Sequence, residues 1–248
     1  EEYDILNTNT AGFGVLINHA ISQGANNLIL CVGGSASVDG GIGALREMGL
    51  TIVNNSPNRN YITDIKGINT ELLQQKFKEI HITILCDVDN PICGPEGAAA
   101  VFAPQKGASP EQIIMLDNQL CLWSDLLKQN TGKDITQLKH GGAAGGITAA
   151  MYALLNAQLI SGSEYCLTLS RFHDNLLQAG VVITGEGKID LQSFYGKIPG
   201  TVANLCQKHN VPVYAVVGLA EKQVLTRFDK VFIMSQYTRS IQDSIKNA

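Results

Sequence analysis

Short β-branched runs, each followed by a glycine-rich turn and a helical stretch, recur along the 248-residue chain and limit its fold more than anything else in the sequence. The clearest runs cover residues 27–32, 80–85, 181–184 and 211–217, and residues 230–234 form a further strand candidate. This alternation predicts an α/β fold with parallel strands. Ligands of open parallel sheets bind beyond the carboxyl ends of the strands, so the glycine-rich turns are where chemistry is expected.

Composition excludes several classes of protein. With 45% hydrophobic and 16% charged residues, the chain is expected to pack into a globular protein. A net charge of −4 with scattered lysines and arginines argues against nucleic-acid binding, and the longest apolar helical pattern, GITAAMYALLNAQLI, is too short to span a membrane. The cysteines occur singly, without a C-x-x-C pair, and we expect buried, reduced thiols in a cytoplasmic protein. They are Cys31, Cys86, Cys93, Cys121, Cys166 and Cys206.

Two helices are predicted from local signals. Ser109 begins the segment Ser-Pro-Glu-Gln, which is typical of a capped helix start, and an apolar stripe with three- and four-residue spacing follows it. A second helix is predicted over residues 163–177, with its apolar stripe at Tyr165, Leu169, Phe172 and Leu176. The Ser-Gly-Ser break at residues 161–163 is the best candidate for a domain boundary.

The first motif with chemical potential is GGSASVDGG, residues 33–41, between a strand and a helix. Backbone N–H groups in such a turn converge on an anion, and the helix amino terminus adds partial positive charge. Gly34, Ser35 and Asp39 are its candidate binding residues. A tight turn that needs glycine only for its backbone geometry is the alternative.

The second motif, CDVDNP, follows the next strand and carries two carboxylates, Asp87 and Asp89. They could hold a hydrated Mg²⁺ or accept a substrate proton, although Asp and Asn before Pro also favour plain turns. Further along, Lys106 precedes a helix start, where an ammonium group suits a phosphate. A solvated surface lysine is the alternative there.

The third motif, HGGAAGG, begins at His140 and opens an alanine-rich helix. Its small residues permit close approach of backbone to a ligand or to a neighbouring element, and packing is the favoured explanation. His140 could act as a base, but a histidine without a visible partner is more often incidental.

The fourth motif, TGEGKID, is the most informative. Gly185 and Gly187 bracket Glu186, Asp190 follows four residues after the glutamate, and Lys197 precedes a helix. Two acids at a strand-end loop and a cation at a helix amino terminus match the needs of phosphoryl transfer, which are a metal ligand, a base and a neutralising charge. Neither a P-loop nor a dinucleotide-binding glycine fingerprint occurs in this context.

Taken together, these motifs resemble the class I glycerate kinase family. The matching stretches are GGSASVDGGIGALREMG, CDVDNPICGPEGAAAVFAPQKGA, GGAAGGITAA and VVITGEGKIDLQSFYGKIPGTVA, in the order found in the family. The resemblance implies two α/β domains, one flavodoxin-like and one inserted within it, with the site in the cleft between them. It also implies ATP and Mg²⁺ as cofactors and D-glycerate as substrate, with 2-phosphoglycerate the expected product.

On that pattern, residues 1–161 are mostly the inserted domain and residues 162–248 the carboxyl-terminal half of the flavodoxin-like domain. The family's amino-terminal Asp-Ser-Phe-Lys and Asp-Gly-Gly-Glu-Gly motifs have no counterpart here, so we expect the flavodoxin-like domain to be incomplete. The expected catalytic residues are Asp190, Glu186 and Lys197, the two acids also binding the metal, and the expected substrate-binding or phosphate-binding residues are Gly34, Ser35, Asp39, Asp87, Lys106, Gly185 and Gly187.

Two other functions stay open at this point. One is a non-catalytic module that binds a small anion, and the other is a kinase for another small hydroxy acid. Assembly into a homo-oligomer also stays open. A dinucleotide-dependent oxidoreductase is disfavoured, because no suitable glycine fingerprint is followed by an acidic ribose ligand.

Overall fold

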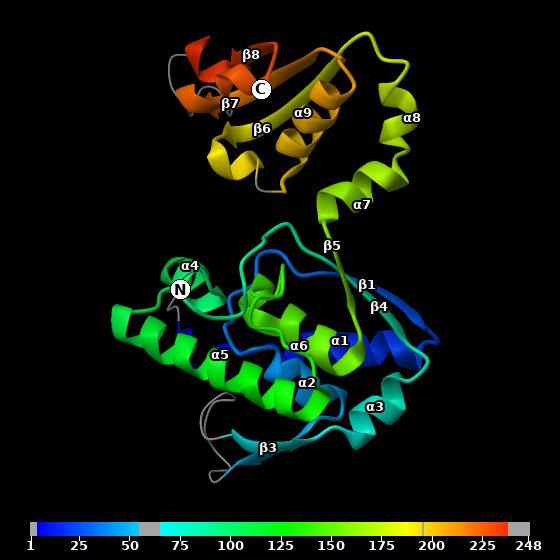
Figure 1. Cartoon of the computed structure of the whole chain (residues 1–248), viewed down its shortest axis with the longest axis vertical. Helices are drawn as coiled ribbons and strands as arrows, with labels where there is room; N and C mark the ends of the chain where they lie inside the picture. Colours follow the sequence, from blue (N-terminus) through cyan, green and yellow to red (C-terminus); the bar gives the residue numbers. More distant parts are fainter. Residues whose placement is uncertain (1–3, 55–64, 195, 238–248) are drawn as a thin grey trace. The chain divides into compact units, whose positions relative to one another are not determined.

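The computed structural model describes residues 4–54, 65–194 and 196–237 (Figure 1). The chain divides into two compact units, Glu1–Ile160 and Ser161–Ala248. That the first is an inserted domain and the second half of a flavodoxin-like domain stays a prediction. None of the helices in the described ranges is long and apolar enough to cross a membrane.

The first unit is built on a three-stranded parallel sheet, as the strand pattern predicts. Its order is β1-β4-β5, with β1 at Asn27–Cys31, β4 at His81–Leu85 and β5 at Gln158–Ile160. Because Cys31 pairs with Leu85 and Leu85 with Ile160, all three strands end at the same edge. A separate antiparallel pair is formed by β2 (Thr51–Asn54) and β3 (Ile65–Asn69).

Helices pack around this sheet and enclose the larger core. They are α1 (Ala11–Ser22), α2 (Ile42–Met48), α3 (Glu71–Phe77), α4 (Ala98–Phe102), α5 (Pro110–Thr131) and α6 (Ile147–Leu155), with the short 3₁₀ helices η1 (Pro104–Lys106) and η2 (Ala143–Gly146). Trp123 of α5 is buried in the core, and its indole N–H donates to the carbonyl of Gly40 at 3.1 Å. This contact ties α5 to the glycine-rich turn after β1.

The long helix α5 confirms the prediction from its start signals. The Ser109 side chain accepts the backbone N–H of Gln112, and the Gln112 side chain accepts the N–H of Ser109, which completes a capping box. The predicted apolar stripe faces the core, where Leu116, Leu120, Trp123 and Leu127 are buried.

The second unit is a smaller parallel sheet with the order β6-β7-β8. Its strands are β6 (Val182–Ile189), β7 (Val213–Ala220) and β8 (Lys230–Ile233), and its helices are α7 (Gly162–Leu169), α8 (Phe172–Leu176) and α9 (Ile198–Lys208), with the 3₁₀ helices η3 (Leu191–Phe194), η4 (Lys222–Arg227) and η5 (Met234–Gln236). Residues of α9 share a buried cluster with β7, so α9 covers one face of the sheet (Figure 1).

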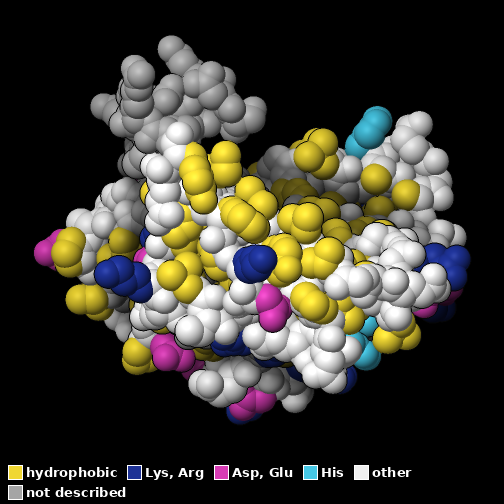
Figure 2. All heavy atoms as spheres, turned by 90° about the horizontal axis from the view of Figure 1, so that it is seen from above, with side chains coloured by type: hydrophobic (Ala, Val, Ile, Leu, Met, Phe, Trp, Pro, Cys, Tyr) yellow, Lys and Arg dark blue, Asp and Glu magenta, His cyan; other side chains and the backbone are white. Residues whose placement is uncertain are grey.

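The opposite face of this sheet keeps apolar side chains at the surface. Ala215 and Val217 of β7 are buried towards α9, whereas Ile183, Val216 and Phe232 lie on the other face and are exposed. Figure 2, seen from above, shows hydrophobic side chains gathered with few charged groups among them. In the described part of the second unit, α9 therefore covers one face and the other remains apolar and open.

Two predictions about this region are wrong. The single helix predicted over residues 163–177 is two helices, because Arg171 adopts a left-handed backbone (φ 53°) that ends the first and starts the second. Leu169, placed in the predicted stripe, is 68% exposed, and Leu167 is buried instead. The fourth motif was expected on a strand-end loop, but its glycines and Glu186 lie within β6.

The expectation of buried, reduced cysteines also needs correction. Cys93 and Cys121 are joined as a disulfide that links the segment after β4 to α5. Cys86 and Cys206 are free and buried, whereas Cys31 and Cys166 are free and exposed. The sequence pattern could not show the pair, because 28 positions separate its cysteines and no short-spaced motif marks it.

Candidate active site

The carboxyl ends of the strands in the first unit border a cavity of about 300 Å³. Its walls come from residues 32–35 after β1, 85–88 at the end of β4 and beyond, 102 in α4, 105–106 in η1 and 143–144 in η2. Three motifs that are far apart in the sequence therefore meet at one place, together with Lys106. The predicted residues Gly34, Ser35, Asp87 and Lys106 all line this cavity.

The backbone brings these loops together for simple reasons. Since β1, β4 and β5 are in register, their next residues emerge side by side, and the N–H of Cys86 donates to the carbonyl of Ile160 at 2.9 Å. Gly34 turns the first loop with a left-handed backbone (φ 72°), which glycine adopts without strain. The loop can then present Ser35 to the cavity.

Lys106 is the main charged group of the cavity. It is only 7% exposed, and its ammonium donates to the Ser35 hydroxyl at 3.1 Å and to the carbonyl of Ser37 at 2.8 Å. Burial lowers the pKa of Lys106 to about 8, against the opposing attraction of Asp39. The surface-lysine alternative is therefore wrong, and the group is suited to binding a carboxylate or phosphate.

Asp39 lies behind the same loop, with its carboxylate turned into the protein. It accepts hydrogen bonds from the N–H and hydroxyl of Thr10 at 2.9 and 2.7 Å, and from the N–H groups of Gly41 and Gly43 at 3.1 Å each. These contacts join the start of α1 to the start of α2. Asp39 is thus placed to position the loop, and it is not among the residues that line the cavity.

A second cavity, of about 320 Å³, adjoins the first and shares Val32, Gly33, Ser35 and Ala144 with it. The residues particular to it include Thr10 and Phe13 from the start of α1. A larger groove of about 630 Å³ lies at the amino ends of the same strands, beside His81 and Gln158. We place the site at the carboxyl ends because the glycine-rich loops and the buried ammonium are there, as parallel sheets favour.

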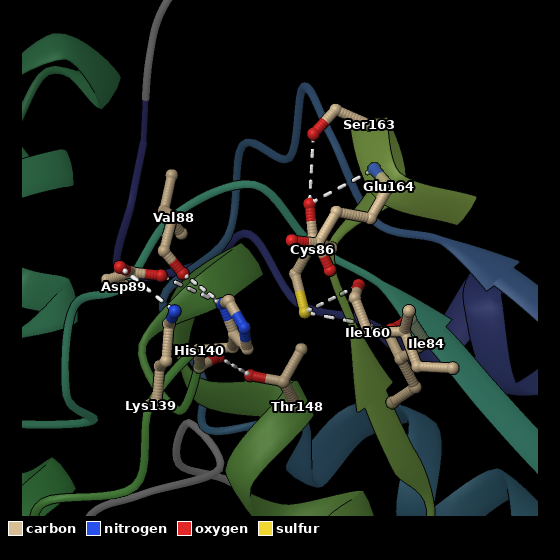
Figure 3. Close-up of polar contacts among 11 residues, drawn as sticks. Ile84, Cys86, Val88, Asp89, Lys139, His140, Thr148, Ile160, Ser163 and Glu164 are labelled. Atoms are coloured by element: carbon tan, nitrogen blue, oxygen red, sulfur yellow. Dashed lines mark hydrogen bonds and ion pairs between the residues drawn. The ribbon is translucent and has the colours of Figure 1, made fainter. Parts of the chain in front are cut away.

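The loop after β4 carries a thiol and is held by His140. Burial, with the nearby charge of Asp87, raises the pKa of Cys86 to about 11, so this thiol is a poor nucleophile. The nearly buried ring of His140 contacts the carbonyl of Val88 (Figure 3). The expectation that His140 lacks a partner is therefore wrong.

In the second unit, the acids of the fourth motif share one serine. The Ser193 hydroxyl donates to Glu186 Oε2 at 2.7 Å and accepts the backbone N–H of Asp190 at 3.2 Å. Glu186 Oε1 accepts from the ammonium of Lys197 at 3.2 Å. The predicted Glu186, Asp190 and Lys197 thus lie together, with Gly185 and Gly187 in the same strand.

Asp190 has one oxygen without a protein partner. Its Oδ2 lies 3.2 Å from the ammonium of Lys188, whereas its Oδ1 is buried and accepts no hydrogen bond within the described structure. Burial acts to raise the pKa of Asp190, but the Lys188 hydrogen bond and the charges of Lys188 and Lys197 outweigh it, so this pKa lies below its usual value. Asp190 is therefore ionised at neutral pH, with a lone pair available to a ligand.

These residues fit a magnesium ion bound with a nucleotide. No cluster of three or more metal-binding side chains occurs among the described residues, but Mg²⁺ commonly takes only one or two carboxylates and completes its shell with water and phosphate. The unpartnered Oδ1 of Asp190 and the nearby carboxylate of Glu186 would supply such ligands.

Comparison with known proteins agrees with the motifs. The model of the glycerate kinase family matches residues 1–248 of the chain. The chain belongs to the glycerate kinase family. The predicted recognition is confirmed, and so is the α/β class with parallel sheets.

Named relatives in the glycerate kinase family are more than a third identical to this chain over the aligned residues. Glycerate 2-kinase of Escherichia coli strain K12 is 38% identical over 223 residues, covering 88% of the chain and 58% of that protein. A glycerate kinase of Halalkalibacterium halodurans is 37% identical, covering 88% of the chain and 59% of that protein. The chain thus spans about three fifths of the length of these relatives.

A crystal structure of a candidate glycerate kinase 2 from Salmonella typhimurium LT2 resembles this chain with a TM-score of 0.76 and 36% identity. The match covers 99% of the chain and 67% of that structure. Both units therefore follow the fold of the glycerate kinase family.

Sequence reasoning missed several residues that support the candidate site. Ser37 contacts Lys106, and Thr10 contacts Asp39. Both pairs are far apart in the sequence, so no local pattern reveals them. Ser193 stands in the stretch after the fourth motif, but no local pattern shows that its hydroxyl contacts both Glu186 and Asp190.

Proposed function

We propose that this protein is a glycerate kinase, which transfers the γ-phosphoryl group of ATP to D-glycerate and forms 2-phosphoglycerate. The observation that carries the proposal is the convergence of Ser35, Asp87 and Lys106 on one small cavity at the strand ends. A cavity of about 300 Å³ suits a small hydroxy acid. We further propose a cytoplasmic enzyme that acts on this small molecule, without a nucleic-acid or membrane partner.

In the first unit, the chain's own groups would bind and orient the acceptor. The ammonium of Lys106 has three N–H donors, two of which are held by Ser35 and Ser37, so the third can reach a carboxylate or phosphate oxygen. The carboxylate of Asp87 would accept a hydrogen bond from a substrate hydroxyl and draw its proton away during transfer. Gly34 lets the backbone approach the ligand closely, and Asp39 keeps the loop in place.

In the second unit, Asp190 and Glu186 would hold Mg²⁺, which neutralises the phosphate chains of ATP when bound. Lys197, already paired with Glu186, would add positive charge near the transferred group. Gly185 and Gly187 would let phosphate oxygens come close to the backbone of β6. That both sets of residues serve one reaction is part of the proposal, as is the use of ATP and Mg²⁺.

The test is a coupled ATPase assay with D-glycerate, with the product identified by NMR. The wild-type protein should turn over D-glycerate and yield the 2-phosphate, while Lys106→Met and Asp190→Asn should lose at least a hundredfold in kcat/KM. Lys133→Met is the matched control, because Lys133 is also partly buried and hydrogen-bonded, to Tyr152 and Asn156, but lies outside the cavity.

Two results would argue against parts of this proposal. Wild-type turnover by Asp190→Asn would remove the assignment of this acid. Calorimetric binding of D-glycerate without turnover, in the full-length protein, would favour a non-catalytic anion-binding module. A panel of small hydroxy acids separates glycerate from other acceptors.

A further inference from the structure

The wall of the cavity formed by Asp87 and Val88 has little support from its own strand. It lies beyond the end of β4 at Leu85, where the ladder with β5 stops. Contacts from another element therefore bear on where Asp87 and Val88 lie in the cavity wall. The residues that hold it come from the start of the third motif.

Residues 139–142 contact this loop at Val88, Asp89 and Asn90. Figure 3 shows the contacts of Lys139 and His140 with Val88 and Asp89. The His140 ring nitrogen Nδ1 lies 2.8 Å from the carbonyl of Val88, and since a carbonyl only accepts, Nδ1 carries the proton. The same nitrogen lies 3.3 Å from Asp89 Oδ1, while Lys139 lies 3.3 Å from Asp89 Oδ2. The carbonyl of Asn90, the next residue of the loop after Asp89, accepts the N–H of Gly142 at 2.8 Å.

The His140 backbone is itself fixed. Its carbonyl accepts the hydroxyl of Thr148 at 2.6 Å, and Thr148 is fully buried in α6. The His140 backbone is left-handed (φ 68°), a conformation that glycine or asparagine adopts more easily. A bulky ring at such a position is unfavourable for the backbone alone, which indicates that the ring's contacts offset the strain.

The ring therefore joins two walls of one cavity. Val88, on one wall, is held by the ring, and Ala143 and Ala144, on another, follow His140 within four residues. Nδ1 contacts the Val88 carbonyl and His140 is not among the residues that line the cavity, so we infer that the ring acts on the loop. Its nearly complete burial keeps water from competing for this hydrogen bond.

We propose that His140 is a positioning residue, whose ring holds the Asp87–Val88 wall so that Asp87 faces the cavity in a fixed place. The part of this inference that concerns turnover rests on the proposed kinase function. The holding role does not, because it is a property of the folded chain alone.

Three variants separate the ring from the backbone. His140→Gly removes the ring and relieves the left-handed backbone, which partly offsets the loss of the ring's contacts. His140→Asn keeps a residue that tolerates this backbone and has an N–H donor near the same place. Asn210→Gly is the control, because Asn210 also has a left-handed backbone (φ 55°) but lies in the second unit and is exposed.

Two readouts are needed. Hydrogen–deuterium exchange should become faster in the peptide covering residues 86–97 of His140→Gly and stay unchanged in Asn210→Gly. Measured well below the melting temperature of the variant, the kcat/KM of His140→Gly for D-glycerate should fall roughly 10- to 100-fold, as expected for a misplaced catalytic group, and His140→Asn should recover most of it.

The outcomes separate this inference from the proposed function. Unchanged exchange in His140→Gly overturns the holding role, and faster exchange with unchanged kinetics overturns the positioning role. Faster exchange in a protein that does not phosphorylate D-glycerate supports the holding role while it refutes the proposed function.

Discussion

Replacing Lys106 by methionine should leave the protein as stable as the wild type or more so, while ligand binding is lost. Burial lowers the pKa of Lys106 from the usual 10.5 to about 8, so keeping the ammonium charged at pH 7 costs the folded state roughly 3 kcal/mol. Methionine fills a similar volume without a charge. Against this gain, the carbonyl of Ser37 loses its donor, which costs about 1–3 kcal/mol. The net change in unfolding free energy is therefore roughly 0–2 kcal/mol in favour of the variant.

The unfolding free energy of the wild type should also change with pH in a direction that the pKa of Lys106 fixes. The pKa of Lys106 is lower in the folded protein than in the unfolded chain, so between pH 8 and pH 10.5 the unfolded chain binds more protons. The unfolding free energy of the wild type should therefore rise with pH through this window, relative to Lys106→Met. Below pH 8 the full cost of the buried charge is present, and the difference between the two proteins should be constant.

The assay is urea unfolding of the wild type, Lys106→Met and Lys133→Met at pH 7 and pH 9.5, with D-glycerate binding followed by calorimetry. Burial also lowers the pKa of Lys133, but Lys133 is outside the cavity, so its variant should keep binding. A Lys106→Met protein that is less stable by more than about 2 kcal/mol at pH 7 would show that Lys106 stabilises the fold. The reasoning fails in that case, and also if Lys106→Met binds D-glycerate as the wild type does.

Two further predictions concern contacts near the site. Ser193→Ala leaves Glu186 Oε2 and the Asp190 N–H without their shared partner, so kcat should fall at least tenfold in the coupled assay. Ser193→Thr should retain activity. A kcat of Ser193→Ala equal to that of the wild type would contradict the supporting role of Ser193. Cys121→Ser opens a disulfide that spans 28 positions, and should lower the unfolding free energy by about 3.5 kcal/mol in urea. Reductant should bring the wild type to the same midpoint, and a midpoint that reductant leaves unchanged would exclude the disulfide.

The parts of the fold that sequence predicted are those set by neighbouring residues. The β-branched run at β1 and the capping box at Ser109 act within a few positions, so strand and helix follow from local preference. The loops after β1 and β4 were found for the same reason, because a parallel sheet fixes where its strands end. Their meeting in one cavity then needs only the register between β1 and β4.

The parts that sequence missed depend on distant partners. The glycines around Glu186 disfavour a strand, yet the segment is extended because Glu186 pairs with Val217 and Lys188 with Leu219 across to β7. The break between α7 and α8 at Arg171 was not predicted, because the spacing of apolar residues does not show a left-handed backbone within the pattern. At Glu186, tertiary pairing overrides a local preference.

Asp39 and Asp190 show why site residues cannot be separated from structural ones by motif alone. Both acids lie in glycine-rich motifs, but four hydrogen bonds from the chain occupy the Asp39 carboxylate, whereas Asp190 keeps one buried oxygen that has no partner among the described residues. A buried acceptor left in this state costs about 1–3 kcal/mol, and the buried charge of Lys106 carries a similar cost. Among the described residues, the candidate site of each unit thus contains a polar group whose burial the chain does not fully offset. Ligands that complete these groups, a cation at Asp190 and an anion at Lys106, would remove both costs on binding, which is the arrangement expected of a phosphoryl-transfer enzyme.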